Sequence, residues 1–310
     1  MTAALHDFAR NVLGAYTDQE THEPTGRRRV LHLTDGDGRS WYCKQTGLRL
    51  QWRAEVRAYR RWFAAAAGDV PQLRAADRPR RLLMVSALPG QIVDEPGPEV
   101  HQAAGALLRR LHDAWPTRRE PHAKRAQMTK RLDRELWSAG GDFSSAEEDF
   151  VREHMRGFRE LPLLEEVACH GDYGPHNWLV DEAGSVRAID FAESKWNPVP
   201  FDLARLCLQS WWDKPTHSAA FFAGYGRVLT DIEHEYLRHQ VVRSAVAAIQ
   251  WGRRHDAHHV ETRARSRLSD LMNGHLFDLR DGAGFSSTMR SVARRVLTRR
   301  SPADGAATRS

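Results

Sequence analysis

The sequence of 310 residues is poor in cysteine and lysine and has no long apolar run. Its three cysteines, Cys43, Cys169 and Cys207, are widely spaced and odd in number, which argues for reduced, partly buried thiols and against a disulfide framework or a zinc site. No apolar stretch approaches the roughly 18 residues that a membrane helix needs. The first residues, MTAALHDFARN, lack the basic and apolar segments of a secretory signal. We therefore expect a cytoplasmic protein without a membrane partner.

The basic charge of the chain is carried almost entirely by arginine. The net charge is +6 and the isoelectric point about 9.5, yet only 5 of the 46 basic residues are lysines. An arginine excess of this kind is typical of GC-rich coding, so it is weak evidence for nucleic-acid binding. The sequence also lacks basic strands interleaved with aromatic residues. We expect no nucleic-acid partner, whereas a polyanionic small molecule fits the charge.

Strand and helix patterns divide the chain into two parts. Residues 28–46 predict two strands around an Asp-Gly-Asp-Gly turn. Residues 47–66 predict a helix with one apolar face, and residues 81–88 predict a buried strand that Pro-Gly terminates. The apolar face of the helix is assigned to Leu50, Val56, Tyr59 and Phe63.

From residue 98 onward the apolar spacing is helical. The sequence therefore predicts an N-lobe over residues 1–88, a linker over 89–97 and a C-lobe over 98–300. The last ten residues, 301–310, have the composition of a disordered tail.

The stretch CHGDYGPHNWLV, residues 169–180, concentrates polar residues ahead of a short apolar strand. Two apolar runs, 179–180 and 186–189, flank turn residues and predict a hairpin. An antiparallel hairpin brings the residue before its first strand, Asn177, beside the residue after its second, Asp190. Asp172 lies on the loop that leads to the same corner. An amide oxygen and two carboxylates form a hard-oxygen set suited to Mg²⁺.

The same residues match the pattern of phosphoryl transfer. That pattern has a catalytic-loop Asp, an Asn five residues later, a metal-binding Asp on the next loop, and a strand Lys paired with a helix Glu. Asp172 and Asn177 have this spacing, and Asp190 begins Asp-Phe-Ala where the pattern has Asp-Phe-Gly. Lys44 lies in a predicted strand, and Glu55 in the helix that follows it.

With these residues the sequence resembles the aminoglycoside phosphotransferase and choline-kinase-like branch of the protein-kinase fold. The resemblance spans about residues 28–275 and rests on His170-Gly171-Asp172, Asn177, Ile189-Asp190-Phe191 and Phe201-Asp202-Leu203-Ala204. It implies a bilobal α+β fold, with a small antiparallel sheet in the N-lobe and a larger, mainly helical C-lobe.

The resemblance also implies roles for individual residues. Asp172 would be the catalytic residue, and Asn177 and Asp190 would hold Mg²⁺. Lys44, held by Glu55, would contact the phosphates of ATP or GTP. The nucleotide base would be bound by the backbone of Ser86, Ala87 and Leu88, and the catalytic loop would be supported by His170 and Asp202. One departure concerns residues 21–26, which contain a single glycine and no G-x-G-x-x-G loop to cover the phosphates.

The acceptor is expected to be a small molecule. No Ala-Pro-Glu segment follows Asp190, and the short stretch 193–198 leaves no platform for a peptide. Candidate acceptor-site residues are His176, Glu193, Trp196, Trp211 and Trp212.

A polycationic aminoglycoside would favour a cluster of acids in the C-lobe. The candidates are interleaved with arginines: Asp213, Asp231, Glu233, Glu235, Asp256, Glu261 and Asp270.

The sequence therefore predicts an O-phosphotransferase that moves the γ-phosphoryl group of a nucleoside triphosphate to a small-molecule hydroxyl, with antibiotics as the leading acceptor class. Two alternatives stay open: a metabolite kinase of the choline or homoserine type, and a pseudokinase module that binds nucleotide without turnover.

Overall fold

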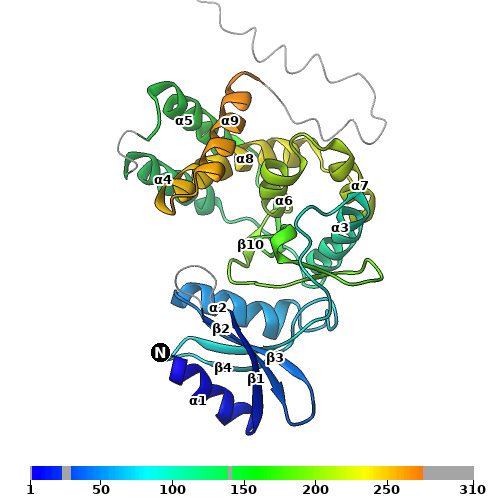
Figure 1. Ribbon diagram of the computed structural model, residues 1–310. Coiled ribbons are helices and arrows are strands. Elements are labelled where there is room, and N and C mark those ends of the chain that lie inside the picture. The colour runs from blue at the N-terminus through cyan, green and yellow to red at the C-terminus, as the bar shows by residue number, and fades with distance from the viewer. Residues whose placement is uncertain (1, 23–28, 139–141, 275–310) are drawn as a thin grey trace, which may run out of the picture.

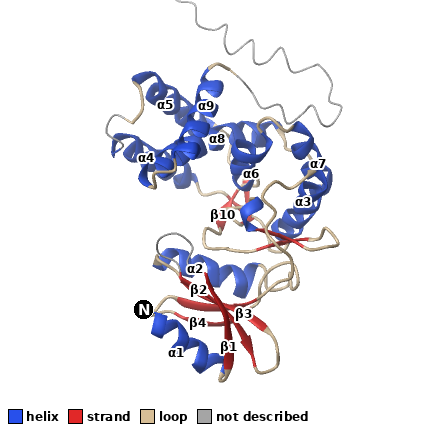
Figure 2. Ribbon diagram, in the orientation of Figure 1, coloured by secondary structure: helices blue, strands red, loops and turns tan. Residues whose placement is uncertain are grey.

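The computed structural model describes residues 2–22, 29–138 and 142–274 and has two lobes (Figure 1). The N-terminal lobe contains a five-stranded sheet, and the rest of the chain is mainly helical with short strands (Figure 2). The predicted bilobal α+β fold is confirmed. Within the described residues, no helix is both long enough and apolar enough to span a membrane.

The N-terminal lobe is an antiparallel five-stranded sheet with the order β1-β2-β3-β5-β4. Its elements are α1 (Thr2–Leu13), β1 (Tyr16–His22), β2 (Arg29–Asp35), β3 (Ser40–Gln45), α2 (Arg49–Arg57), β4 (Leu73–Asp77) and β5 (Leu82–Ser86). A π-helical turn, Ala58–Trp62, continues α2. The hairpin predicted at 28–46 is confirmed as β2 and β3, although residue 28 lies outside the described residues, and the buried strand predicted at 81–88 is confirmed as β5.

The alternation of side chains in β3 and β5 points Lys44 away from α1. Cys43, Leu82 and Met84 pack with the α1 residue Leu5 in one apolar cluster. Leu83 and Val85 face the other way and join the main core. Since successive strand residues point to opposite faces, Lys44 shares the side of the sheet that faces α2.

The predicted apolar face of the helix at 47–66 is wrong at one position. Val56, Tyr59 and Phe63 are buried, but Leu50 is 76% exposed. Six residues separate Leu50 from Val56, which at 3.6 residues per turn places the two on different faces. Trp52, four residues before Val56, takes the buried position and donates a hydrogen bond to the Leu82 carbonyl at 2.9 Å.

The C-terminal lobe packs helices around two small sheets. Its helices are α3 (Pro98–Asp113), α4 (His122–Ser138), α5 (Ser145–Glu160), α6 (Pro200–Leu206), α7 (Pro215–Tyr225), α8 (Asp231–Arg254) and α9 (His258–Met272). Its strands are β6 (Arg118–Arg119), β7 (Glu165–Cys169), β8 (Trp178–Val180), β9 (Val186–Ala188) and β10 (Lys195–Asn197). The order β10-β7-β6 forms one sheet, and β8 and β9 form the predicted hairpin.

Several contacts tie the two lobes together near the connector between β5 and α3. Gln91 and Val180 exchange backbone hydrogen bonds of 2.9 Å. Asp69, in the segment after α2, accepts two hydrogen bonds from the Arg110 guanidinium at 2.8 and 3.0 Å. The Asp69 carbonyl also accepts from the Ala188 N–H at 3.0 Å. The β8–β9 hairpin is therefore held by Gln91 in the connector and by Asp69 in the N-terminal lobe.

Candidate active site

The β8–β9 hairpin brings Asn177 to the segment that contains Asp190. Trp178 pairs with Ala188, and the Ile189 N–H donates to the Asn177 carbonyl at 3.1 Å. A short 3₁₀ turn, Pro175–Asn177, leads from the catalytic loop into β8. The Asn177 side-chain amide donates to the Asp172 carbonyl at 2.9 Å. The hairpin expected from sequence therefore does connect Asp172, Asn177 and the Asp190 segment.

His170 is buried between the loop that carries Asp172 and the residue that precedes Asp190. Its Nε2 lies 3.0 Å from the Ile189 carbonyl, and the Asp172 N–H donates to its Nδ1 at 3.3 Å. Burial lowers the pKa of His170, more than nearby carboxylates raise it. The imidazole is therefore neutral, with its proton on Nε2, since a carbonyl can only accept.

Asp202 fixes the backbone of the catalytic loop. Its carboxylate accepts from the His170 N–H at 2.9 Å and from the Gly171 N–H at 2.7 Å. Burial by itself would raise the pKa of Asp202, but the hydrogen bond and charge of His112 lower it overall. An ionised carboxylate with two backbone N–H donors is a strong anchor.

Two residues that support Asp202, His112 and Tyr225, were missed from sequence. His112, near the end of α3, places Nε2 3.0 Å from Asp202 Oδ2 and Nδ1 2.9 Å from the Tyr225 hydroxyl. His112 and Asp202 are separated by 90 residues in the chain. The only local signal was a histidine after the apolar stretch of a predicted helix.

Gly171 replaces the arginine of the protein-kinase His-Arg-Asp triplet for a steric reason. Its φ is +87°, in the region that favours glycine. A Cβ at this position would overlap the backbone carbonyl of Glu193. The catalytic loop therefore packs directly on the segment after Asp190, with no room for a side chain between them.

The carboxylate of Asp172 is flanked by two cationic or hydrogen-bonding groups. Arg205 of α6 contacts Asp172 Oδ1 through Nη1, and His176 Nε2 lies 3.3 Å from the same oxygen. Burial by itself would raise the pKa of Asp172, but the His176 hydrogen bond and the Arg205 charge lower it well below its usual value. Asp172 is therefore ionised at neutral pH. Arg205 was not among the residues predicted from sequence.

Lys44 lies between two carboxylates that come from different lobes. Its Nζ is 2.5 Å from Glu55 Oε1 and 3.2 Å from Asp190 Oδ1. Burial by itself would lower the pKa of Lys44, but Glu55 and Asp190 raise it overall. Tyr59 donates to the same Glu55 oxygen at 3.2 Å. The sequence-predicted pair of Lys44 and Glu55 is present, and it is linked directly to Asp190.

Asn177 and Asp190 provide a donor set that fits a magnesium ion. The Asn177 NH₂ group is used by the Asp172 carbonyl, so its Oδ1 points away from that bond. Asp190 has a φ of +61°, an uncommon conformation for a residue other than glycine. Its side chain remains 27% exposed beside Lys44. Amide and carboxylate oxygens are the ligands that Mg²⁺ prefers.

The predicted base-binding segment has part of its backbone already engaged. The Ser86 N–H donates to the Gln72 carbonyl, and the Ala87 N–H donates to the Ser40 carbonyl, each at 2.9 Å. Leu88 is only half-buried, and its N–H forms no backbone hydrogen bond with the part of the chain that the structure describes. Of the three backbone N–H groups in the predicted segment, that of Leu88 is therefore the one open to a ligand.

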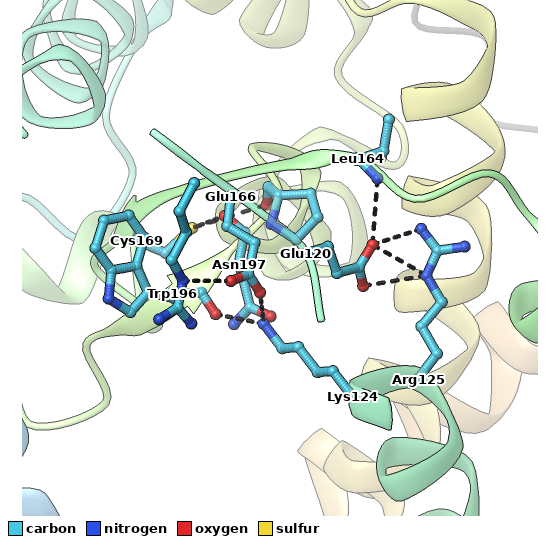
Figure 3. A network of polar contacts seen from close by, with 10 residues as sticks. Glu120, Lys124, Arg125, Leu164, Glu166, Cys169, Trp196 and Asn197 are labelled. Carbon is cyan, nitrogen blue, oxygen red and sulfur yellow. Dashed lines mark hydrogen bonds and ion pairs between the residues drawn. The ribbon is translucent and has the colours of Figure 1, made fainter. Parts of the chain in front are cut away.

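The candidate acceptor residues separate into two groups. Glu193 is near the catalytic loop and accepts from Gln51 of α2 at 2.8 Å. Trp196 is half-buried in β10, and its backbone carbonyl accepts from Lys124, which also pairs with buried Glu166 (Figure 3). Trp211 and Trp212 belong to the hydrophobic core, with exposures of 3% and 8%. Trp211 donates to His101 at 3.2 Å.

With this geometry established, the chain can be compared with known proteins. A model of the phosphotransferase enzyme family, APH, matches residues 24–239. The chain belongs to this family. No curated protein sequence matches it.

Solved structures of other phosphotransferases share the fold. The aminoglycoside phosphotransferase APH(4)-Ia has 15% identity, with 89% of this chain and 100% of that chain covered and a TM-score of 0.66. The GDP and kanamycin complex of APH(2")-IIia has 12% identity, coverage of 88% and 100%, and a TM-score of 0.62. The macrolide 2'-phosphotransferase MphH from Brachybacterium faecium has 20% identity, coverage of 88% and 98%, and a TM-score of 0.57. At these identities the likeness establishes the fold of this phosphotransferase family member and not its substrate.

Proposed function

We propose that this protein is a Mg²⁺-dependent kinase that transfers the γ-phosphoryl group of ATP or GTP to a hydroxyl of a small molecule, with antibiotics as the leading acceptor class. The observation that carries the proposal is two groups of contacts, Glu55–Lys44–Asp190 and Asp172–Asn177. The backbone hydrogen bond from the Ile189 N–H to the Asn177 carbonyl joins them. Together they unite the N-lobe lysine, both expected metal ligands and the catalytic aspartate. A pseudokinase module has no requirement for all of these groups together.

The residues around Asp172 suit an in-line transfer. In the reaction, the acceptor oxygen forms a bond to the γ-phosphorus, while the bond from that phosphorus to the β–γ bridging oxygen breaks. The electron pair of the broken bond leaves on the nucleoside diphosphate, and the hydroxyl proton passes to the Asp172 carboxylate. Because its pKa is lowered, Asp172 is ionised when the acceptor binds, and it accepts a hydrogen bond that orients the hydroxyl before the proton is transferred.

The other groups would bind and orient the donor. Lys44, kept protonated by two carboxylates, would contact the donor phosphates while Glu55 holds its position. Asn177 and Asp190 would hold Mg²⁺, which when bound neutralises charge on the β- and γ-phosphates. His170 and Asp202 would keep the catalytic loop in place through its backbone.

The comparisons support the nucleotide and acceptor classes. One similar structure is a complex with GDP and kanamycin, and another, a thermostable mutant of APH(4)-Ia, is a complex with ADP and hygromycin B. Macrolide phosphotransferases are also among the similar structures. Antibiotics of different chemistry are therefore the first acceptors to assay.

The test is nucleoside diphosphate release with Mg²⁺ and ATP or GTP, against a panel of hydroxyl-bearing antibiotics and metabolites. We expect acceptor-dependent release that Asp172→Ala abolishes while nucleotide binding is retained. Asp190→Ala should instead lose the magnesium-dependent part of nucleotide binding. Near-normal turnover in either variant would contradict the assigned roles, and nucleotide binding without release for any acceptor would favour a binding module.

A further inference from the structure

The acidic residues that would attract a polycationic acceptor are largely neutralised within the C-lobe. Of the seven acids identified from sequence, five form ion pairs with arginines. The pairs are Asp213 and Asp270 with Arg267, Glu233 with Arg227, Glu235 with Arg238, and Glu261 with both Arg253 and Arg265. Paired carboxylates retain little attraction for a further cation. The structure therefore offers no strong acidic trough among these residues.

The surface beside the catalytic loop carries cations instead. Lys195 of β10 pairs in register with Cys169, three residues before Asp172. Its Nζ lies 4.7 Å from the centre of the Phe201 ring, and the Arg243 guanidinium lies 5.3 Å from the same ring. Phe201 and Arg205 are one helical turn apart on α6, so they share a face. Arg205 in turn contacts Asp172.

Lys195 lacks a carboxylate partner in the part of the chain that the structure describes. It forms no ion pair there, although Glu193 is near enough to act on its charge. Its side chain is exposed at its tip, and the protein packed around its stem lowers its pKa, an effect that Glu193 opposes and the Arg243 charge reinforces. Two neighbouring positive charges, one of them an ammonium without a carboxylate partner among the described residues, attract an anionic ligand.

We propose that the acceptor is an alcohol that also carries an anionic group, a carboxylate or a phosphate, which binds Lys195 and Arg243 beside Phe201. This proposal rests on the proposed kinase function and names the charge class of its acceptor. Phosphoryl transfer would occur at a hydroxyl next to Asp172, while the anionic group stays bound at the Lys195–Arg243 site. A cationic acceptor, such as a polyamine-like antibiotic, would be disfavoured at this cationic surface.

The test uses four probes that share one sugar ring and differ in charge: glucose, glucosamine, glucuronate and glucose 6-phosphate. Binding is measured by calorimetry on the full chain, with the nucleotide site saturated by Mg²⁺ and a non-hydrolysable nucleoside triphosphate. Variants are Lys195→Gln and Arg243→Gln, with Lys130→Gln on the exposed face of α4 as the control. The two anionic probes separate a carboxylate site from a phosphate site.

We expect an anionic probe to bind at least about tenfold more tightly than glucose or glucosamine, the size of effect of one charged hydrogen bond. Lys195→Gln should remove this preference, Arg243→Gln should weaken it, and Lys130→Gln should retain it. Equal binding of all probes, tighter binding of glucosamine, or a preference that survives Lys195→Gln would overturn the proposal. Acceptor-dependent turnover of a neutral or cationic substrate, insensitive to Lys195→Gln, would refute the proposal and leave the kinase function intact.

Discussion

At the scale of single residues, the site depends on contacts that leave no space for an extra atom. Gly171 adopts a positive φ and lies against the Glu193 carbonyl, while its N–H donates to Asp202. Its neighbours His170 and Asp172 are thereby fixed in one backbone conformation. This packing explains how a loop that contains a glycine can hold the carboxylate of Asp172, the proposed catalytic residue, in place.

Gly171→Ala should therefore impair catalysis more than nucleotide binding. A Cβ would push the loop away from Glu193 and shift Asp172, and strain of this kind costs of the order of 1–3 kcal/mol. We expect kcat to fall by at least about tenfold in the nucleoside diphosphate assay, with nucleotide affinity little changed. Gly184→Ala is a suitable control, because Gly184 also has a positive φ, of 76°, but faces open space in the β8–β9 turn. Equal effects of the two variants would contradict the packing explanation.

The site residues that were predicted from sequence make local contacts, whereas those that were missed contact residues far away in the chain. Asn177 and the Asp190 segment were found because one hairpin brings them together, over 13 residues of chain. Arg205 and His112 were missed because their contacts with Asp172 and Asp202 join residues 33 and 90 positions apart. Such contacts depend on how α3 and α6 pack, which no local pattern specifies.

At the scale of elements, a buried ion pair network joins α4 to the sheet beneath the catalytic loop. Glu166 in β7 is fully buried and pairs with Arg118 of β6 and with Lys124 of α4. Lys124 also donates to the Trp196 carbonyl in β10 (Figure 3). One lysine therefore connects a helix with two neighbouring strands, and β10 continues directly into the segment that carries Asp202.

Lys124→Met should be strongly destabilising because it removes one of the two cations from a buried carboxylate. Breaking a buried pair in this way costs about 3–5 kcal/mol, which thermal or denaturant unfolding can measure. Lys130→Met is the matched control, since Lys130 lies on the same helix and is exposed. A loss below about 1 kcal/mol for Lys124→Met would show that Arg118 alone compensates Glu166.

Element prediction from sequence was reliable where the pattern was local. The hairpin at 28–46 and the strand at 81–88 were correct because turn residues and β-branched or apolar runs mark their ends. The apolar face of α2 was wrong at Leu50, where Trp52 is buried instead. The helix also widens into a π turn at Ala58–Trp62, and such a turn depends on packing against the core.

At the scale of the whole molecule, several buried histidines make stability depend on pH. Burial lowers the pKa of His101 to about 3, of His154 to about 4 and of His239 to about 3. His154 and His239 face each other across α5 and α8, with their Nδ1 atoms 3.1 Å apart. All three are therefore neutral in the folded protein at pH 5–7.

The unfolded chain binds protons at these histidines below about pH 6.5, whereas the folded chain binds them only near pH 3–4. The contribution of these neutral histidines to the free energy of unfolding is therefore complete above pH 6.5, and it is lost as the pH falls from there toward 4. Each histidine contributes a slope of up to about 1.4 kcal/mol per pH unit. The free energy of unfolding measured by urea titration should decline steeply between pH 6.5 and 4.5.

His239→Gln, which removes one of these protonations, should make that decline shallower by about the slope of one histidine, whatever it does to stability at pH 7. His258→Gln, at an exposed position at the start of α9, is the control for the substitution itself. The comparison concerns slopes, so a constant loss of packing in His239→Gln does not affect it. An unfolding free energy that stays constant from pH 6.5 to 4.5 would show that these histidines bind protons equally in the folded and unfolded chains, which would contradict the effect of burial.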